Sequence, residues 1–479
     1  MKIPRIAYCS PVNPASSGIS DYSEELLPYL GQYADITLYL EDGLQPDNPQ
    51  LARHLEVQPL RRLERAHRRR PYDAIVYHMG NSPVHAGIWR AAQRLPGVIV
   101  LHEFVLHHFM LWYAANMQHD VQRYVREMQA RYGEEGAHIA QLMIRGRFTE
   151  ATFQFPLCEP VVAAARGLLA HSRYVQARVK ALQPELPTSV VPMGVPLPPA
   201  IPRAAARARL GVAPDALLLA SFGHINAYKR LEPALRALLE LHREYPETRY
   251  VLVGSMSPHY DVPGLIRRMG LEDVVTITGY VPRATFEDYV AAADICLNLR
   301  HPTAGETSAS LLRLLGAGRP TLVSATGAFT ELPPDVAAQV DPDAGESALI
   351  LAYCRLLAGR PDVAATLGAQ ARAYVAQEHT LERAAQGYAR FLARLYRWDL
   401  VRRVRPTPLW SLETAAPADE TSDARAPDAA TRPADTPAPS HPIPAVGRAL
   451  AELGINERDT ALLRSVAARL AELEGGTED

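Results

Sequence analysis

The sequence has few of the features that mark secreted, zinc-binding or nucleic-acid-binding proteins. Only four of its 479 residues are cysteine, and Cys9, Cys158, Cys296 and Cys354 lie far apart. This spacing excludes a zinc ribbon and a dense disulfide scaffold, and it predicts a reducing, cytoplasmic setting. Lysine and arginine number 50 against 52 aspartates and glutamates. No overall charge therefore favours nucleic acid or an anionic membrane, and any anion site must be local.

Long apolar runs are also absent. No window approaches the roughly 20 apolar residues of a membrane-spanning helix, and the first residues read as a strand rather than a signal peptide. Hydrophobic residues make up 48% of the chain and charged residues 21%, which excludes disorder of the whole chain. At this length a single core is too small, so the sequence predicts two or three domains.

Short β-branched runs alternate with longer helical patterns, which predicts parallel βαβ units and an α/β fold class. The strands expected in the first half are residues 3–8, 36–40, 74–77, 98–101, 168–171 and 189–191. Those expected in the second half are residues 217–222, 250–253, 274–278, 295–298 and 321–323, followed by helices at 346–358 and 362–398. Each half thus predicts a doubly wound, Rossmann-like sheet.

A proline-rich segment at residues 196–202 separates the two halves. Proline cannot donate to a helix or to a central strand, so we place the domain boundary there. The N-terminal domain is expected over 1–197 and the C-terminal domain over 203–398, with a last helix that could pack back on the N-terminal domain. Residues 104–165 are longer than a crossover needs, and we expect a helical insertion that shapes a pocket or an interface.

The end of the chain has a different composition. Residues 414–445 are rich in Pro, Ala, Asp and Thr, which predicts a flexible linker. Residues 446–475 repeat apolar positions at spacings of three and four, which predicts a terminal helix. That helix could dock weakly on the rest of the chain, bind a protein partner or self-associate.

Polar residues follow the expected strands of the first half, where ligands of open α/β sheets bind. After the first strand, small residues lead into a helix at Gly18, where free amides and the helix dipole favour an anion. A simple turn and helix cap is the alternative. His102 ends the fourth strand, and residues 77–81 end the preceding one with polar side chains. Together they predict one wall of a cleft, with a structural histidine as the alternative.

Lysine is rare in this chain. Apart from Lys2, Lys180 and Lys229, every basic residue other than histidine is arginine. Lys229 lies in a loop at 221–230 between an expected strand and an expected helix, where a compact ammonium suits a phosphate oxygen. A solvated lysine beside Arg230 is the alternative.

The segment 299–308 carries the strongest pattern. A strand end, Gly305, the hydroxyls of Thr307 and Ser308, and a helix beginning near Thr307 together predict a phosphate cradle without metal. The carboxylate of Glu306 suits sugar hydroxyls, because it accepts hydrogen bonds. A helix cap with an acidic residue in its first turn is the alternative.

The order and spacing of these motifs resemble the family-four retaining glycosyltransferases of the GT-B fold over roughly residues 3–395. The segments that carry the resemblance are 18–22, 171–172, 192–195, 223–230, 252–254, 293–294 and 305–320. The resemblance implies two Rossmann-like domains facing a cleft and a nucleotide-sugar donor, with UDP or GDP, held mainly by the C-terminal domain. It also implies transfer with retention to an acceptor hydroxyl, as in polysaccharide biosynthesis, and no metal or other cofactor.

By this resemblance, Lys229 contacts the donor diphosphate, His102 lies near the transferred sugar, and Gly18 lies near the phosphates and the acceptor. One departure is His224, which stands where the family usually has an arginine and is cationic only when protonated. Diphosphate binding then rests on Lys229, Arg230 and backbone amides.

A second departure concerns two glutamates that the family places eight positions apart. Here the two positions hold Gly305 and Arg313, and Glu306 follows the first of them. Arginine cannot accept hydrogen bonds from ribose hydroxyls, so we expect Arg313 to point to the diphosphate and Glu306 to serve the sugar. A subgroup with a Gly-Glu-Thr-Ser loop fits this pattern, and the departure also gives weight to a pseudoenzyme.

Retaining hydrolases use two carboxylates about 5 Å apart, and no such pair is evident in the sequence. We therefore expect the acceptor hydroxyl to attack on the leaving-group side while a donor phosphate oxygen takes its proton, as proposed for the family. A nucleotide-sugar epimerase of the same architecture and a non-catalytic sugar-nucleotide or glycan-binding scaffold are the alternatives. A nicotinamide-dependent oxidoreductase is disfavoured, because no Gly-x-Gly-x-x-Gly follows the first strand.

Two charged patterns have plainer explanations. Residues 341–343 (Asp-Pro-Asp) match an Asp-x-Asp metal motif, but a loop before a helix explains them better. The arginines of 61–70 predict a solvated helix face. The alternative is peripheral contact with the inner face of a membrane, where lipid-linked acceptors reside.

Overall fold

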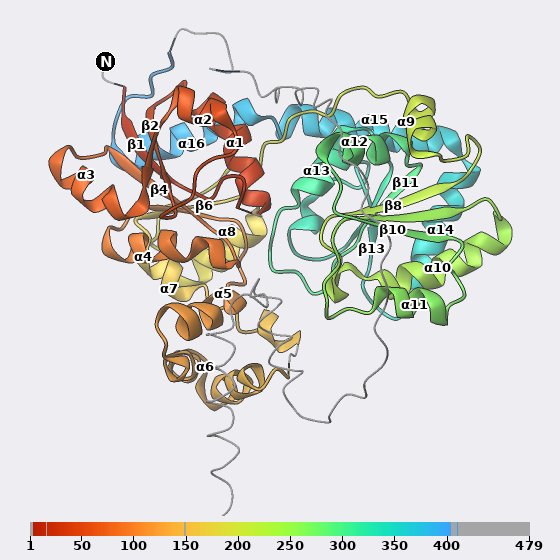
Figure 1. The fold of residues 1–479 in the computed structure, drawn as a ribbon, viewed down its shortest axis with the longest axis horizontal. Coiled ribbons are helices and arrows are strands. Elements are labelled where there is room, and N and C mark those ends of the chain that lie inside the picture. The colour runs from red at the N-terminus through yellow and green to blue at the C-terminus, as the bar shows by residue number, and fades with distance from the viewer. Residues whose placement is uncertain (1–2, 16, 148–149, 404–409, 411–479) are drawn as a thin grey trace, which may run out of the picture.

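The computed structural model describes residues 3–403 and 410, apart from 16 and 148–149. The chain forms two lobes, each built on a parallel sheet covered by helices (Figure 1). The linker expected at 414–445 and the helix expected at 446–475 lie outside the described residues. Over the described part of the chain, no helix combines the length and the apolar character needed to span a bilayer.

The N-terminal sheet has seven parallel strands in the order β3-β2-β1-β4-β5-β6-β7. The strands are β1 (Arg5–Cys9), β2 (Asp35–Leu40), β3 (Glu56–Pro59), β4 (Ala74–Met79), β5 (Val98–Leu101), β6 (Gly167–Ala170) and β7 (Thr188–Val190). The helices around the sheet are α1 (Gly18–Leu30), α2 (Pro49–His54), α3 (Leu63–Arg69), α4 (Ala86–Arg94), α7 (Glu159–Ala164) and α8 (Arg173–Leu182). Every residue of β4 and β5 is buried, which explains why these strands read as continuous apolar runs.

Helices occupy most of the segment between β5 and α7. They are α5 (His107–Trp112), a π-helical turn (Tyr113–Met117) and α6 (Val121–Ile144), followed by a short turn at Glu150–Phe153. Gly133 has a φ of 66° and divides α6 into two helical parts. This insertion has its own small core around Tyr124 and Met128. Figure 1 shows α6 at the foot of the N-terminal lobe, away from its sheet.

The C-terminal sheet has six parallel strands in the order β10-β9-β8-β11-β12-β13. The strands are β8 (Leu218–Phe222), β9 (Arg249–Val253), β10 (Val275–Gly279), β11 (Ile295–Asn298), β12 (Thr321–Ser324) and β13 (Ala338–Val340). The helices are α9 (Arg203–Leu210), α10 (Leu231–Glu244), α11 (Val262–Arg268), α12 (Arg283–Ala292), α13 (Ala309–Gly316), α14 (Glu346–Gly359), α15 (Pro361–Glu378) and α16 (Leu381–Tyr396). Strand order reverses between β8 and β11, as it does between β1 and β4, and ligands of open α/β sheets bind at such switch points.

Three expectations about secondary structure need correction. The edge strand β3 was not expected, because none of its residues is fully buried and it ends in Pro59. The helix expected over 362–398 is two helices, because the side chain of Thr380 accepts a hydrogen bond from the backbone N–H of Arg383 and caps α16. The helix expected to begin near Thr307 begins at Ala309 and is capped by Ser308.

The chain crosses between the lobes twice, and the two crossings are hydrogen-bonded to each other. The backbone N–H of Val195 donates to the carbonyl of His379 at 2.9 Å. The Nδ1 atom of His379 lies 2.8 Å from the carbonyl oxygen of Met193. Beyond this point α16 packs on α1, where the hydroxyl of Tyr22 donates to that of Tyr388 at 3.2 Å. The last helix therefore belongs spatially to the N-terminal lobe.

Candidate active site

A pocket of about 350 Å³ lies between the lobes, at the carboxyl ends of the central strands. From the N-terminal lobe it is lined by Asn81, Glu103, Val105, His108 and Phe153. From the C-terminal lobe it is lined by Gly223, His224, Asn226, Tyr228, Lys229, Arg300, Pro302, Ala304, Glu306 and Ser310. It therefore occupies the switch point of the C-terminal sheet, between β8 and β11, and faces the ends of β4 and β5 of the N-terminal sheet.

Direct contact between the lobes closes one side of this pocket. The carbonyl of Ala304 accepts hydrogen bonds from the backbone N–H groups of Phe104 at 2.7 Å and Val105 at 3.1 Å. Gly305 is buried with a φ of 82°, and a β-carbon there would lie 3.0 Å from that of Phe104. Both the backbone conformation and the close approach therefore require glycine. Across the pocket, the ring of Phe153 from the insertion meets Tyr228 edge-on at 4.9 Å between centroids.

Lys229 places its ammonium group in this pocket. Its Nζ donates to the carbonyl of Phe222 at 2.7 Å and lies over Gly223. Burial and the neighbouring Arg300 hold the pKa of Lys229 well below its usual value, and Glu306 opposes that shift. The ammonium is therefore poorly compensated by the protein alone, and an anion bound beside it would stabilise its charge.

Glu306 is held by partners of its own loop. Its carboxylate forms an ion pair with Arg300 and accepts a hydrogen bond from the hydroxyl of Thr303 at 2.9 Å. The side chain is 16% exposed. The carboxylate thus faces the pocket with its orientation fixed.

Glu103 is a second carboxyl group in the pocket, and the sequence alone did not make this pair evident. Burial and the charge of Glu306 raise the pKa of Glu103 to about 7, although the backbone N–H of Asn81, at 3.1 Å, and Arg300 lower it. The two glutamates are far apart in sequence and belong to different lobes. The only local signal for Glu103 is that it directly follows the strand-end residue His102.

The imidazoles of the pocket are expected to be neutral near pH 7. Burial and the proximity of Lys229 lower the pKa of His224, whose Nδ1 lies 2.9 Å from the hydroxyl of Ser255. Burial lowers the pKa of His108 to about 4. The basic side chains that remain in the pocket lining are Lys229, whose pKa is lowered, and Arg300, which is paired with Glu306.

Comparison with known proteins shows which proteins this chain resembles. A model of a family described as "Glycosyl transferase-like" matches residues 230–390. A D-inositol 3-phosphate glycosyltransferase of Kineococcus radiotolerans is 38% identical over 151 residues, which are 29% of this chain and 35% of that protein. One from Kribbella flavida is 31% identical over 186 residues, 36% of this chain and 43% of that protein. The chain therefore spans less than half the length of these curated relatives.

Solved structures resemble nearly the whole described chain. A sucrose-phosphate synthase from Thermosynechococcus elongatus superposes with a TM-score of 0.60 at 18% identity, covering 82% of this chain and 99% of that one. The Anabaena protein HepE in complex with UDP and glucose superposes with a TM-score of 0.59 at 17% identity, covering 81% and 99%. This chain has the GT-B fold. The fold class expected from the sequence is thereby confirmed, and the C-terminal lobe of this GT-B protein carries the glycosyl transferase-like match.

The GT-B cleft brings together three of the residues predicted from the sequence, namely His224, Lys229 and Glu306. Asn81 joins them there, from the segment 77–81 that was expected to form one wall of the cleft. Glu103, His108, Arg300 and Ser310 also line the pocket and were not among the predicted site residues. Arg300 stands in the predicted segment 299–308, but no local pattern distinguishes it from the many other arginines of the chain.

His102 does not line this pocket. It is 5% exposed and lies in a buried histidine cluster, with its Nε2 atom 2.9 Å from Nδ1 of His78 and its ring 4.8 Å from that of His171. Burial and these imidazoles hold its pKa well below its usual value. His102 therefore lies in the buried cluster next to the pocket residue Glu103 in the chain. Its predicted contact with the transferred sugar stays a prediction.

Gly18 and Arg230 also lie outside the pocket lining. Gly18 is the exposed first residue of α1, whose N-terminal cap is Ser17. Arg230 has a φ of 55° and pairs with the buried Glu346 at the start of α14, with Nε 2.9 Å from Oε2. Its guanidinium therefore has a structural partner already.

The remaining predicted residues lie around α13. Gly305 packs on the N-terminal lobe, and Thr307 and Ser308 line a different interdomain pocket of about 380 Å³. The hydroxyl of Ser308 caps α13 by accepting from the N–H of Leu311 at 3.2 Å. Arg313 pairs with Glu25 of α1 at 2.7 Å.

Among the described residues, no group of three or more His, Cys, Asp or Glu side chains is arranged to hold a metal ion. In the Asp-Pro-Asp loop, Asp343 accepts a hydrogen bond from the N–H of Gly345 at 2.7 Å. That contact shapes the turn between β13 and α14, as a loop interpretation predicts.

Proposed function

We propose that this protein is a glycosyltransferase that moves a sugar from a nucleoside-diphosphate donor to an acceptor hydroxyl. The proposal includes retention of anomeric configuration and independence from metal. The observation that carries it is the ammonium of Lys229 at the switch point of a GT-B fold, facing Arg300 and two carboxyl groups. The glycosyl transferase-like match over residues 230–390 supports the reaction class.

The main chemical demand is to stabilise the departing nucleoside diphosphate. Preorganised cations in a partly dry site do this with little reorganisation. Lys229 and Arg300 supply two cations in the pocket, and a bound diphosphate would raise the pKa of Lys229 back toward its usual value by supplying the opposite charge. Because the imidazole of His224 is neutral in the empty site, it would act as a neutral hydrogen-bonding partner unless the negative charge of a bound diphosphate raises its pKa enough for it to take up a proton.

The two carboxyl groups have separate roles in this proposal. Glu306, fixed by Arg300 and Thr303, accepts hydrogen bonds from hydroxyls of the transferred sugar. Glu103, with a pKa of about 7, is present in both protonation states near neutral pH and can donate to or accept from a hydroxyl. A phosphate oxygen of the donor takes the acceptor proton, which requires no enzymatic base.

The donor and the acceptor follow from different parts of the pocket. We take UDP-sugars as the first donors to test, because HepE was crystallised with UDP and glucose. Phe153 and His108 of the insertion line the pocket beside the C-terminal lobe, so we place the acceptor against the insertion. A glycan, a lipid-linked acceptor or a small molecule would each be bound there, with peripheral membrane contact through the exposed arginines of 61–70 as a further proposal.

The test compares two lysines of the chain. Lys229→Met is expected to reduce transfer from a UDP- or GDP-sugar by about 100-fold or more, because it removes a charge that stabilises the leaving group. Lys180→Met is the matched control, since Lys180 of α8 donates to the carbonyls of Pro184 and Leu186 and does not line the pocket.

A thermal-shift screen with nucleoside diphosphates precedes that assay. Millimolar ligand with micromolar affinity stabilises a protein by about 4 kcal/mol. We expect a shift in the wild type and in Lys180→Met and a smaller one in Lys229→Met. No shift with any nucleoside diphosphate would contradict the proposed function, and unchanged turnover in Lys229→Met would contradict the assigned role of the lysine. Release of rearranged sugar without acceptor would instead indicate the epimerase.

A further inference from the structure

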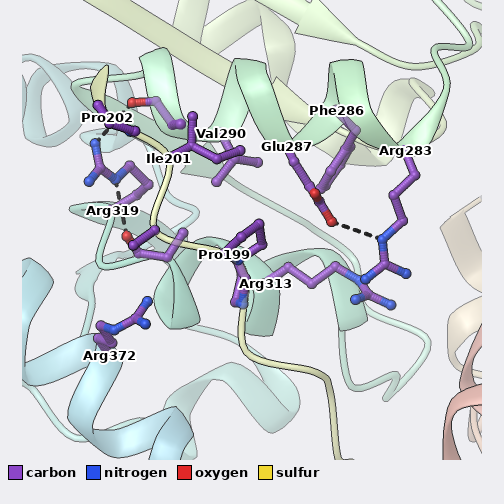
Figure 2. Close-up of a pocket in the computed structure, with 14 residues that line it drawn as sticks. Pro199, Ile201, Pro202, Arg283, Phe286, Glu287, Val290, Arg313, Arg319 and Arg372 are labelled. Carbon is purple, nitrogen blue, oxygen red and sulfur yellow. Dashed lines mark hydrogen bonds and ion pairs between the residues drawn. The ribbon is translucent and has the colours of Figure 1, made fainter. Parts of the chain in front are cut away.

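A further cavity, of about 420 Å³, lies where the proline-rich segment 198–202 crosses α12 and α13. Figure 2 shows Pro199, Ile201 and Pro202 along one wall, with Phe286 and Val290 of α12 beside them. None of its lining residues lines the candidate active site. Its size falls in the range of about 300–1,000 Å³ that is typical of small-molecule sites.

Four arginines line this cavity, and Figure 2 shows them as two pairs on opposite sides. In the first pair, Arg283 and Arg313 share the carboxylate of Glu25 from α1, at 2.8 Å and 2.7 Å. Arg283 also pairs with Glu287 at 3.0 Å. This pair of arginines is therefore matched by two carboxylates.

The second pair, Arg319 and Arg372, binds only backbone carbonyls. Arg372 donates from Nη1 to Gly316 at 2.6 Å. Arg319 makes contacts of 3.3 Å with the carbonyls of Ala317, Ala291 and Ala293. These carbonyls lie at the ends of α12 and α13, where the helix dipole favours a cation but does not neutralise it. In the described part of the chain, neither arginine forms an ion pair, so two net positive charges border the cavity.

The two kinds of wall define the chemistry of an occupant. Guanidinium groups bind phosphate oxygens in a planar, bidentate manner. The proline ridge and Phe286 offer a flat apolar surface to the rest of a molecule. An occupant with a phosphate at one end and a ring at the other satisfies both walls.

We propose that this cavity is a binding site for a phosphorylated small molecule, with the phosphate between Arg319 and Arg372 and the ring on the proline segment. The ligand contacts the connection between the lobes and lies beside the arginines that hold Glu25 of the N-terminal lobe.

Calorimetric titration of the full chain with a sugar phosphate and with a nucleoside monophosphate tests this proposal. The double variant Arg319→Gln/Arg372→Gln is expected to bind at least about tenfold more weakly, because two charge-assisted hydrogen-bonding groups are lost. Lys229→Met and Arg355→Gln are expected to bind like the wild type, since Arg355 pairs with Glu244 outside the cavity. Unchanged affinity in the double variant overturns the proposal, and so does loss of binding in Lys229→Met alone, which would locate the ligand in the candidate active site.

Arg319 and Arg372 also brace helix ends, so the double variant could fold poorly. A second measurement uses the wild-type protein only. Crystals soaked in tungstate, an anion with a strong anomalous signal, are expected to show a peak between Arg319 and Arg372. A peak in the cleft at Lys229 with none at these arginines overturns the second site and leaves the proposed transferase function standing.

Discussion

Replacing Glu103 by glutamine is expected to stabilise the protein, and to do so more strongly as the pH rises. Burial and the charge of Glu306 raise the pKa of Glu103 from 4.5 to about 7. A carboxyl group with a raised pKa in the folded state favours folding below its unfolded pKa, and this contribution is lost as the pH rises through the folded pKa. The relevant window therefore runs from about pH 4.5 to pH 7.

The size of the effect follows from the shift. The difference of 7 − 4.5 = 2.5 pKa units corresponds to about 3 kcal/mol at about 1.4 kcal/mol per unit. Glutamine carries no charge and keeps an oxygen that can accept the hydrogen bond from the N–H of Asn81. The free energy of unfolding of Glu103→Gln relative to the wild type should thus rise by about 2–3 kcal/mol between pH 5 and pH 8.

Urea unfolding of both proteins at pH 5 and pH 8 measures this difference. The comparison of the two proteins at pH 5 serves as the internal control, because Glu103 is mostly neutral at that pH in the folded wild type. Glu306→Gln is expected to remove part of the effect, since the charge of Glu306 contributes to the raised pKa. A difference between Glu103→Gln and wild type that stays constant with pH would refute the shared pocket of two carboxyl groups.

Three further predictions concern contacts that support the cleft. Glu25→Ala leaves Arg313 without its carboxylate and should lower the free energy of unfolding by up to about 3 kcal/mol in urea titrations, whereas Glu25→Gln should cost less. Gly305→Ala should cost more than about 1 kcal/mol in the same assay, because of its positive φ and the approach of Phe104, and should weaken nucleotide binding. Burial lowers the pKa of His171 to about 4, so the free energy of unfolding should fall as the pH drops from 6.5 toward 4. Calorimetric melting at several pH values measures this, and the absence of such a fall would contradict the burial of His171 in its neutral form.

The features of this molecule that can be predicted from the sequence are those that depend on residues close together in the chain. The alternation of apolar runs with helical patterns gives both sheets, because strands buried on both faces must be apolar along their whole length. Lys229 stands out because lysine is rare in the chain, and the structure places it in the pocket. The split at Thr380 was missed because a single hydroxyl that caps a helix has a weak signal in an apolar periodic segment.

The parts that sequence could not give are contacts between distant segments. Nothing near Arg313 indicates that its partner is Glu25, because the two residues meet only when α1 and α13 face each other. In the same way, Arg230 forms an ion pair with Glu346 and does not line the pocket. This ion pair is evident only once α14 is seen to pack beside α10. The identity of a charged residue is visible in a sequence, whereas the partner that satisfies it depends on the fold.

The hydrogen bonds that join Met193 and Val195 to His379 constrain how this protein can open. Because the two chain crossings are hydrogen-bonded to each other, we expect the lobes to rotate about this point rather than to separate, and such a rotation would first break the contacts of Ala304 with Phe104 and Val105. Substrate would then enter when rotation of the lobes opens the side of the cleft that lies farthest from these hydrogen bonds. The hydrogen bonds themselves would move little during turnover.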